Sequence, residues 1–288
     1  MTKQHLTNWL LFIVLSITWG SSFILMKKSA EHLNGLQIGA TRIFAAGVSF
    51  LPFAIFHFRY IPKNKLLWVI LSGLFGNLLP AFLFATAISE NGESSLASIL
   101  NSLTPLFVIV IGIFFFKAKV QGKRMAGVLV GFAGLVILSL LRQSGSANDN
   151  GVLLILIATV FYGFTVNVVA HYLKGIEGFR IASVSLAIMA IPAAFVMWQQ
   201  QVFSVAAYDE EAKTSIAVAV LLGVAGSAIA TALYYVLIQK AGGLFASLVT
   251  YAIPIVAMMW GLLANENITA IQVGCLAMIL GGVYLANR

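Results

Sequence analysis

Hydroxyl, amide and aromatic side chains recur inside the apolar segments of this chain, where a polar group is costly unless it faces protein or a water-filled path. Trp19 and Ser22 lie three residues apart, as do Tyr162 and Thr165, so each pair shares one face of a helix. The other members of this predicted site are Asn77, Asn101, Ser227, Tyr234, Thr250 and Tyr251. Such groups can hydrogen-bond a small solute and enclose its apolar body. The chemistry that they predict is binding.

Arg42 is the only charged residue well inside an apolar segment. In one interpretation its guanidinium binds a substrate carboxylate through paired hydrogen bonds. In the other it extends to the nearby outer surface or holds helix-end carbonyl groups. At 1.5 Å per residue it lies about 10 Å from the start of its segment, so both interpretations remain open.

Acidic residues and histidines avoid the interior of these segments. No Asp or Glu lies deep in any of them, which argues against a proton-coupled exporter of cationic drugs. Glu90 and Glu266 stand at segment ends, where we expect surface charges. The four histidines lie at segment ends or in loops without His-Glu-x-x-His spacing, and Cys275 is the only cysteine. We therefore expect no metal, no cofactor and no enzymatic activity.

The elements that must position these residues are membrane-spanning helices. Apolar residues make up 60% of the chain and charged residues 9%, whereas soluble domains carry roughly 25% charge. A spanning helix needs about 20 apolar residues. The fold class predicted is an all-α integral membrane protein with ten spans, at residues 9–26, 36–56, 66–89, 95–116, 125–141, 152–172, 180–199, 215–238, 244–263 and 269–286.

Charge placement predicts the orientation of these spans. With the N-terminus inside, the inner segments hold twelve Lys and Arg residues and the outer segments hold four. The positive-inside rule then predicts a cell-membrane protein of the bacterial inner-membrane type with both termini in the cytoplasm. The net charge of +8 is explained by topology, so a nucleic-acid partner is not needed.

The chain contains an internal repeat of five spans. We divide it into a first repeat at 1–142, a linker at 143–151 and a second repeat at 152–288. Five crossings invert the second copy, which is the layout of carriers with a site near the midplane. The matched motifs, in order, are Ser16, Trp19-Gly20 and Ser22 with Thr159, Tyr162-Gly163 and Thr165; Gly73, Gly76 and Asn77 with Gly223, Gly226 and Ser227; Ser98, Asn101 and Pro105 with Ser247, Thr250 and Pro254; and Gly127 and Gly134 with Gly274 and Gly281.

Two kinds of backbone residue accompany the polar ones. Pro105 and Pro254 predict kinks in spans 4 and 9 that free the carbonyls of Asn101 and Thr250, either at a binding site or as plain packing kinks. Glycines predict close helix approach in spans 5 and 10, at Gly127, Gly131, Gly134, Gly274, Gly281 and Gly282. They do not decide between a monomer and a homodimer.

The order of these motifs resembles the EamA-type branch of the drug/metabolite transporter superfamily. The resemblance implies a ten-helix inner-membrane carrier, often an exporter of amino acids or other small metabolites. The family usually has a glutamate after span 4 as well as after span 9, but Ala118 occupies the first place here. The residues that carry the resemblance are Trp19–Phe23, Arg42, Ser95–Ser98, Leu103–Leu106, Gly127–Gly134, Ala246-Ser247, Ile253-Pro254, Glu266 and Gly274.

The functional prediction is a secondary transporter of small metabolites in the lipid bilayer. Amino acids or related carboxylates are the expected substrates, moved by alternating access at a cavity between the repeats. Alternatives that stay open are a multidrug-type exporter of hydrophobic compounds and a channel-like or structural membrane protein.

Overall fold

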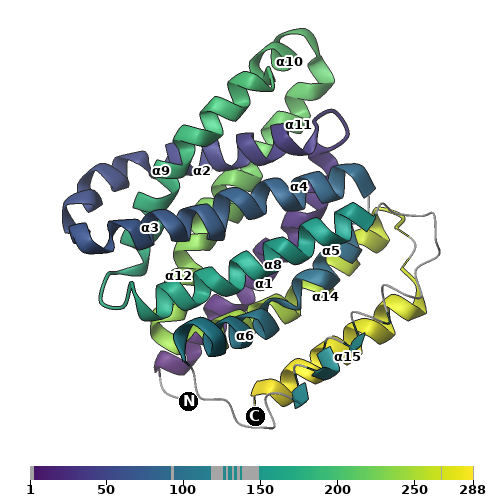
Figure 1. Cartoon of the computed structure of the whole chain (residues 1–288). Coiled ribbons are helices and arrows are strands. Elements are labelled where there is room, and N and C mark those ends of the chain that lie inside the picture. Colours follow the sequence, from purple (N-terminus) through teal and green to yellow (C-terminus); the bar gives the residue numbers. More distant parts are fainter. Residues whose placement is uncertain are drawn as a thin grey trace.

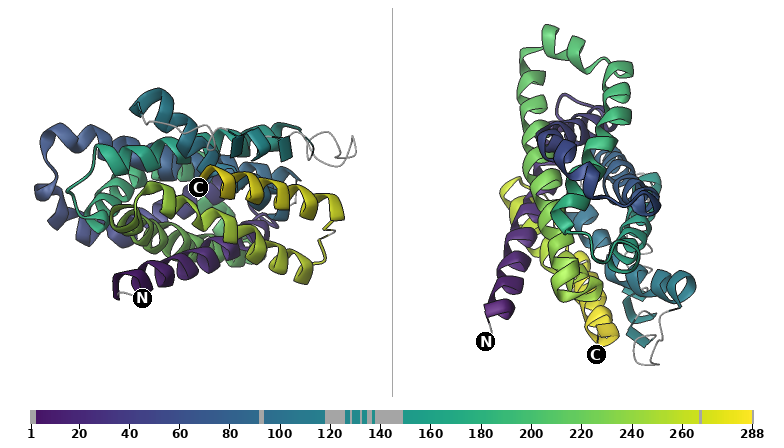
Figure 2. Two further views of the ribbon diagram at one scale, coloured as in Figure 1. Left: turned by 90° about the horizontal axis from the view of Figure 1, so that it is seen from below. Right: turned by 90° about the vertical axis from the view of Figure 1, so that its left-hand side faces the viewer.

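The computed structural model describes residues 3–91, 94–117, 149–266 and 268–287, with a few positions between 126 and 137. All regular elements within these residues are helical, which confirms the predicted all-α class. Most of these helices run side by side in one bundle, and α15 lies apart from its centre in Figure 1. Figure 2 shows both chain ends on the same end of the bundle.

The first half supplies the following elements, in chain order: α1 (Lys3–Ser29), α2 (Gly35–His57), η1 (Phe58–Tyr60), η2 (Lys63–Lys65), α3 (Leu66–Gly73), η3 (Leu74–Leu78), α4 (Leu79–Asn91), α5 (Ser94–Asn101) and α6 (Thr104–Phe116). The second half supplies α8 (Asp149–His171), α9 (Gly178–Gln199), α10 (Val202–Tyr208), α11 (Glu210–Leu221), η4 (Leu222–Ile229), α12 (Ala230–Ala241), α13 (Gly243–Ser247), α14 (Val249–Leu263) and α15 (Ala270–Asn287).

Eight of the predicted spans are helical stretches long and apolar enough to cross a membrane. A shorter apolar stretch, Ala270–Gly282, corresponds to the tenth. The predicted fifth span, 125–141, lies mostly outside the described residues, so the count of ten stays a prediction. The predicted linker, 143–151, begins outside them, and its end belongs to α8.

The third and eighth spans each contain a π-helical segment. η3 and η4 are π-helical segments at the matched glycine motifs, one between α3 and α4 and the other between α11 and α12. A π-helical turn widens the backbone and shifts its hydrogen bonding, and it is frequent at functional sites. The two spans thus deviate from α geometry at equivalent places of the repeat. These π-helical segments were not predicted from the sequence.

The two prolines act differently from the predicted pair of mid-span kinks. The fourth span breaks after Asn101, and Pro105 stands in the first turn of α6, where a missing N–H is harmless. Thr104 Oγ1 donates to the Asn101 carbonyl at 2.7 Å, so this carbonyl is satisfied. In the ninth span the break falls at Leu248, and Pro254 lies inside α14.

The predicted glycine contacts hold only in part. A Cβ at Gly282 would overlap backbone atoms of Gly131, so α15 approaches the described part of the fifth span closely there. Gly274 and Gly281 have open space where a Cβ would stand, with respect to the described atoms. The described residues make no close contact at these two positions, and close helix approach there stays a prediction.

Charged residues that the topology prediction assigned to one side of the membrane contact one another in the structure. Lys27 pairs with Glu266 at 2.8 Å, and both belong to the predicted outer segments. Lys65 donates to the Lys174 carbonyl at 2.9 Å, and both belong to the predicted inner segments. We call the end of the bundle with the first contact the outer end and the end with the second contact the inner end; which of them faces the cytoplasm stays a prediction.

Candidate functional site

A cavity lies in the middle of the bundle, and ten of the eleven predicted site residues line it. About 80 Å³ of it is open to the centres of water-sized molecules, while one water needs roughly 10–15 Å³ by that measure. Tyr251 does not line the cavity, although its neighbour Thr250 does. The ten residues are Trp19, Ser22, Arg42, Asn77, Asn101, Tyr162, Thr165, Ser227, Tyr234 and Thr250.

Sequence reasoning missed much of the apolar lining. Phe23 and Met26 follow Trp19 by four and seven residues, so helical periodicity could have placed them on the same face. Phe84, Val166 and Ile253 look like ordinary core residues in the sequence, and nothing there sets them apart. Thr231 and Tyr235 also line the cavity, and with Ser227 and Tyr234 they stand at the helical spacing i, i+4, i+7 and i+8.

Arg42 points into the cavity from α2. Only 8% of the residue is exposed. Its Nε donates to Ser227 Oγ at 2.6 Å, and its Nη1 lies 3.7 Å from Met26 Sδ. The interpretation in which the side chain extends to the outer surface is therefore wrong. The close approach of α2 to η4 depends on Gly223, because a Cβ there would overlap the Arg42 carbonyl oxygen.

Trp19 of α1 also contacts the π-helical segment η4. Trp19 Nε1 donates to the Gly226 carbonyl at 2.9 Å, a bond between residues of opposite halves. The Trp19 ring meets the Tyr234 ring edge-on, with centroids 4.8 Å apart. A Cβ at Gly226 would lie 2.7 Å from Ser22 Oγ, so this glycine lets α1 pack directly against the segment. We call Arg42, Ser227, Trp19 and Tyr234 the charged wall.

A second group of lining residues forms a neutral hydrogen-bond chain. Thr231 Oγ1 donates to Asn77 Oδ1 at 2.8 Å. Asn77 Nδ2 lies at the limit of a hydrogen bond, 3.5 Å, from the Tyr235 hydroxyl, which donates to the Ser72 carbonyl at 3.2 Å. We call Asn77, Thr231 and Tyr235 the neutral wall. Its polar groups are largely satisfied by one another.

One polar atom between the walls has no protein partner. Thr165 Oγ1 is buried and makes no hydrogen bond with the described residues. An unsatisfied buried hydroxyl typically costs about 1–3 kcal/mol. Thr165 packs against Gly76. A Cβ at Gly76 would lie 2.6 Å from the Thr165 methyl carbon and 3.2 Å from its hydroxyl oxygen. A water or a solute in the cavity could accept this bond.

The charge in the cavity is one-sided. Arg42 is the only ionised side chain among the lining residues that the structure describes, and no Asp or Glu is among them. Within the same part of the chain no group of three or more His, Cys, Asp or Glu side chains could hold a metal ion. The arrangement can bind an anionic group next to an aromatic surface.

Comparison with known families decides what kind of protein carries this cavity. The profile of the EamA-like transporter family matches residues 7–140 and 149–288. The chain belongs to the EamA-like transporter family. It is accordingly a multi-pass membrane protein of the drug/metabolite transporter type, and a transporter rather than an enzyme by family.

Relatives of this EamA-like transporter carry transporter names. An "uncharacterized transporter" of Archaeoglobus fulgidus is 26% identical over 282 residues, covering 96% of this chain and 98% of the relative. The "uncharacterized inner membrane transporter YedA" of Escherichia coli K12 is 26% identical over 284 residues, covering 95% and 88%. A "probable amino-acid metabolite efflux pump" of Salmonella typhimurium is 27% identical over 133 residues, covering 44% and 41%.

A solved crystal structure shares the fold of this EamA-like transporter. It superposes with a TM-score of 0.64, covers 97% of this chain and 96% of its own, and is 19% identical.

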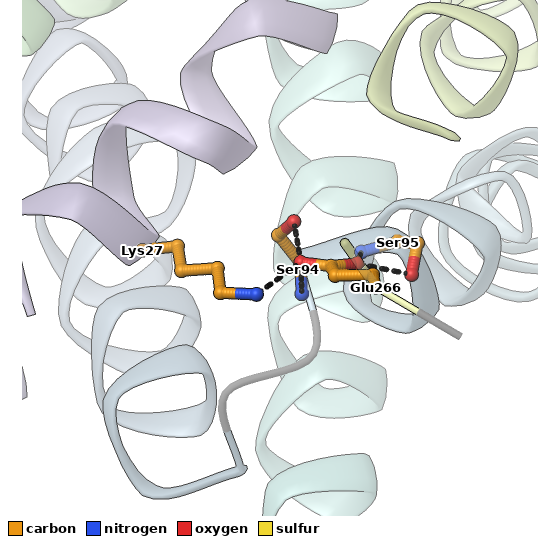
Figure 3. A network of polar contacts seen from close by, with 4 residues as sticks. All are labelled: Lys27, Ser94, Ser95 and Glu266. Atoms are coloured by element: carbon orange, nitrogen blue, oxygen red, sulfur yellow. Dashed lines mark hydrogen bonds and ion pairs between the residues drawn. The ribbon is translucent and has the colours of Figure 1, made fainter. Parts of the chain in front are cut away.

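Glu266 was expected to be a surface charge of this EamA-like transporter, and that expectation is wrong. Its side chain is 7% exposed. Oε1 accepts from Lys27 Nζ at 2.8 Å and from Ser94 Oγ at 2.6 Å, and Oε2 accepts from Ser95 Oγ at 2.6 Å (Figure 3). Burial alone would raise the pKa of this carboxyl, but the hydrogen bonds from Lys27, Ser94 and Ser95 outweigh it and lower the pKa to about 2. Ser95 is among the residues that carry the family resemblance, but nothing in the sequence pairs it or Ser94 with Glu266.

Proposed function

We propose that this EamA-like transporter exports small metabolites that carry a carboxylate, amino acids or related compounds, by alternating access at the central cavity. The observation that carries the proposal is the buried Arg42 guanidinium, which faces a cavity without a described carboxylate. The proposed setting is the inner membrane, with both termini in the cytoplasm.

The electrostatics of Arg42 favour an anionic solute. Taking a cation out of water costs several kcal/mol unless an opposite charge and hydrogen bonds replace the lost hydration. Ser227 and Met26 supply neutral contacts to Nε and Nη1 only. A substrate carboxylate would supply both the missing charge and two acceptor oxygens, in the paired geometry that a guanidinium favours.

The rest of the lining fits the remainder of such a solute. Trp19, Tyr162 and Tyr234 offer ring surface for an apolar or aromatic group. Asn101 and Thr250, at the matched breaks of the two halves, are proposed to orient its polar end. Thr165 Oγ1 is proposed to donate to the solute, because no described residue accepts its hydrogen.

Different observations support the proposed direction of transport and the proposed alternating-access mechanism. The named activity of the Salmonella typhimurium relative supports export of amino-acid metabolites. Cavity residues from both halves meet across the same space, since Trp19 bonds to Gly226 and Arg42 to Ser227. Rocking one half against the other would then expose the cavity to each side in turn, as in carriers built from inverted repeats.

A second candidate is an exporter of hydrophobic compounds without a carboxylate. It is favoured by the aromatic and aliphatic lining, which includes Phe23, Phe84 and Ile253 as well as the ring residues above. In this case Arg42 would serve the packing of α2 against η4, and its replacement would leave substrate choice unchanged.

The test compares metabolites released into the medium by cells that express the wild type, Arg42→Gln, or the double variant Asn101→Ala with Tyr162→Ala, at matched membrane levels. We expect a few carboxylates to accumulate outside only with the wild type. Arg59→Gln is the matched control, because the Arg59 guanidinium stacks on Tyr60 and is not among the cavity-lining residues.

Proteoliposomes that contain the purified protein and one of these metabolites complete the test. Saturable flux that is accelerated by unlabelled metabolite on the opposite side identifies a carrier and contradicts a channel. Equal release by wild type and Arg42→Gln, or release of neutral compounds alone, would contradict the carboxylate proposal and favour the second candidate.

A further inference from the structure

Four residues join three helices at the outer end of the bundle. Glu266 follows α14, Lys27 stands near the end of α1, and Ser94 and Ser95 begin α5. The Glu266 carboxylate accepts from the lysine ammonium and from both serine hydroxyls, and it also lies 3.2 Å from the Ser95 backbone N–H (Figure 3). We call this cluster the latch.

The latch lies at the outer end of the helices that line the central cavity. Lys27 follows the cavity residue Met26. Ser94 precedes the cavity residue Asn101 on α5 by seven residues, about 10 Å along a helix. A Cβ at Gly261 of α14 would lie 2.9 Å from Glu266 Oε2, and this glycine is eight residues, about 12 Å, from the cavity residue Ile253. The three helices that meet at the latch therefore also line the cavity.

The latch connects the two halves of the chain. Lys27, Ser94 and Ser95 belong to the first half and Glu266 to the second. A second bond between the halves, Trp260 Nε1 to Ser21 Oγ at 2.9 Å, runs alongside it. Hydrogen bonds to a charged group are stronger than neutral ones, so the halves are held together firmly at this end.

The inner end has no equivalent cluster in the sequence. The offsets that align the two halves place Ala170 opposite Lys27, and Gly243 and Leu244 opposite Ser94 and Ser95. Residues 117–124, which follow the fourth span, contain four basic residues and no acidic one. The counterpart of the latch glutamate is therefore missing, and so are its donors.

The structure shows apolar contact and open space at the corresponding place. A Cβ at Gly243 would lie 2.8 Å from Val166 Cγ1 and 3.6 Å from Ala170 Cβ, so α13 meets α8 there through van der Waals contact. A groove opens beside it, lined by Ala170, Lys174, Glu177, Gln239 and Gly242 among others.

We propose that Lys27, Ser94, Ser95 and Glu266 form a one-sided gate, which must open for the cavity to reach the outer side and which has no charged counterpart at the inner end. The proposal rests on the alternating access proposed above. Opening the outer end separates the halves and exposes a buried carboxylate with its donors. Among the described residues, the inner end has no such buried carboxylate, and a bond that joins the halves there is the exposed one from Lys65 Nζ to the Lys174 carbonyl at 2.9 Å. The inner end therefore opens more easily, so the resting transporter is closed to the outside.

The experiment measures access to the cavity from each side. Cys275→Ser removes the only cysteine, and Ile253→Cys then places one thiol on the cavity wall. A membrane-impermeant methanethiosulfonate is added to intact cells or to inverted vesicles. Adding Glu266→Gln is expected to raise the labelling rate from the outside about tenfold, the change that ~1.4 kcal/mol gives, and to leave the rate from the inside equal or lower.

Two further variants keep the outcome decisive. Glu31→Gln is the control, because Glu31 pairs with Lys28 on the surface of the same end, with both side chains 56% exposed; its rates should equal those of the parent. Ser94→Ala with Ser95→Ala keeps both charges and should raise outside labelling about threefold, so it carries the test if Glu266→Gln does not reach the membrane.

The contrary outcomes separate the latch from the transport mechanism. Unchanged outside labelling in both latch variants, or an equal rise from both sides, overturns the latch. Equal labelling of the parent thiol from both sides, before any latch substitution, contradicts a resting state closed to the outside. Failure of alternating access itself would appear in the proteoliposomes, as flux that unlabelled metabolite on the opposite side does not accelerate.

Discussion

The cavity has two walls built from the same motif, and they have become chemically different. Gly73, Gly76 and Asn77 in the first half align with Gly223, Gly226 and Ser227 in the second, and both motifs lie at π-helical segments. In η3 the polar residue joins a neutral chain, since Asn77 accepts from Thr231. In η4 the equivalent Ser227 accepts from Arg42.

This difference teaches how a repeated scaffold acquires specificity. The π-helical segments provide the same local geometry twice, with a polar side chain turned toward the cavity. The charge comes from a single residue, Arg42 on α2, which lies ten residues before Pro52. The position ten residues before Pro192 in the second half is Ala182, so the second half has no equivalent cation. One substitution in one copy is thus enough to give the cavity a charged wall and a neutral wall.

Removing the charge should have the largest effect on this comparison. Arg42→Gln is expected to reduce carboxylate flux about 100-fold, because two hydrogen bonds to a charged group are worth roughly 3 kcal/mol together. Arg42→Lys, which keeps the charge and loses the planar fork, should fall between it and the wild type. Asn77→Ala on the neutral wall should cost about fivefold, because a neutral hydrogen bond contributes about 1 kcal/mol. Initial rates of L-phenylalanine and 3-phenylpropionate efflux from proteoliposomes measure all three.

An equal loss of flux in Arg42→Gln and Asn77→Ala, at equal protein content and thermal stability, would contradict the division into charged and neutral walls. A selective loss for Asn77→Ala would reverse it.

The glycines of the two motifs should differ in stability. At Gly223 a Cβ would overlap the Arg42 carbonyl of α2, so Gly223→Ala is expected to lower the free energy of unfolding by about 1–3 kcal/mol. At Gly76 the nearest atom is the Thr165 methyl carbon, a side-chain atom that can shift, so Gly76→Ala should cost less. Unfolding in detergent, followed by circular dichroism, gives both values.

Gly274→Ala is the control for these two variants. No atom of the described residues lies within 4 Å of the position where its Cβ would stand, and alanine is favoured over glycine in a helix by roughly 0.5–1 kcal/mol. We therefore expect unchanged or higher stability. If Gly223→Ala were as stable as Gly274→Ala, the tight contact between α2 and η4 would not exist.

The polar site was predictable because lipid makes a hidden polar group expensive. Trp19, Ser22, Tyr162 and Thr165 interrupt long apolar runs at helical spacing and recur in both halves, so they had to face the protein interior. Ten of the eleven residues chosen on this basis line the cavity. Tyr251 does not, although Thr250 beside it does.

The features that escaped prediction depend on contacts between distant segments. The π-helical segments need a partner that accepts a widened turn, which for η4 is Trp19 bonded to Gly226. The burial of Glu266 depends on Ser94 and Ser95, which are far from it in the sequence and look like ordinary helix-start residues. Local periodicity carries no information about such pairings.

Two threonines that line the cavity, Thr231 and Thr165, should respond differently when the hydroxyl is removed. Thr231→Val removes the donor to Asn77 Oδ1 and is expected to cost about 1–3 kcal/mol, because it leaves a buried acceptor unsatisfied. Thr165→Val removes a hydroxyl that has no described partner, so stability should be unchanged or slightly higher. Its flux should nevertheless fall, since the hydroxyl is proposed to donate to the substrate. Thermal midpoints and carboxylate efflux, measured on the same preparations, separate these outcomes.

Matching losses of stability in Thr165→Val and Thr231→Val would mean that Thr165 is bonded within the protein. Unchanged efflux in Thr165→Val would remove it from the proposed binding site.

The smallest expected effect concerns pH at the outer end, where the Glu266 carboxylate binds donors from both halves. Its pKa is lowered from 4.5 to about 2, so its contribution to stability is present in full above pH 4.5 and is lost as pH falls through about 2. Between pH 8 and 5.5 the thermal midpoints of wild type and Glu266→Gln should therefore differ by a constant amount, and below pH 4.5 the two should converge. Glu31→Gln, in an exposed pair at the same end, should follow the wild type throughout. A difference that does not shrink below pH 4.5 would mean that folding leaves the pKa of Glu266 at its ordinary value, and the latch would then not hold this carboxylate.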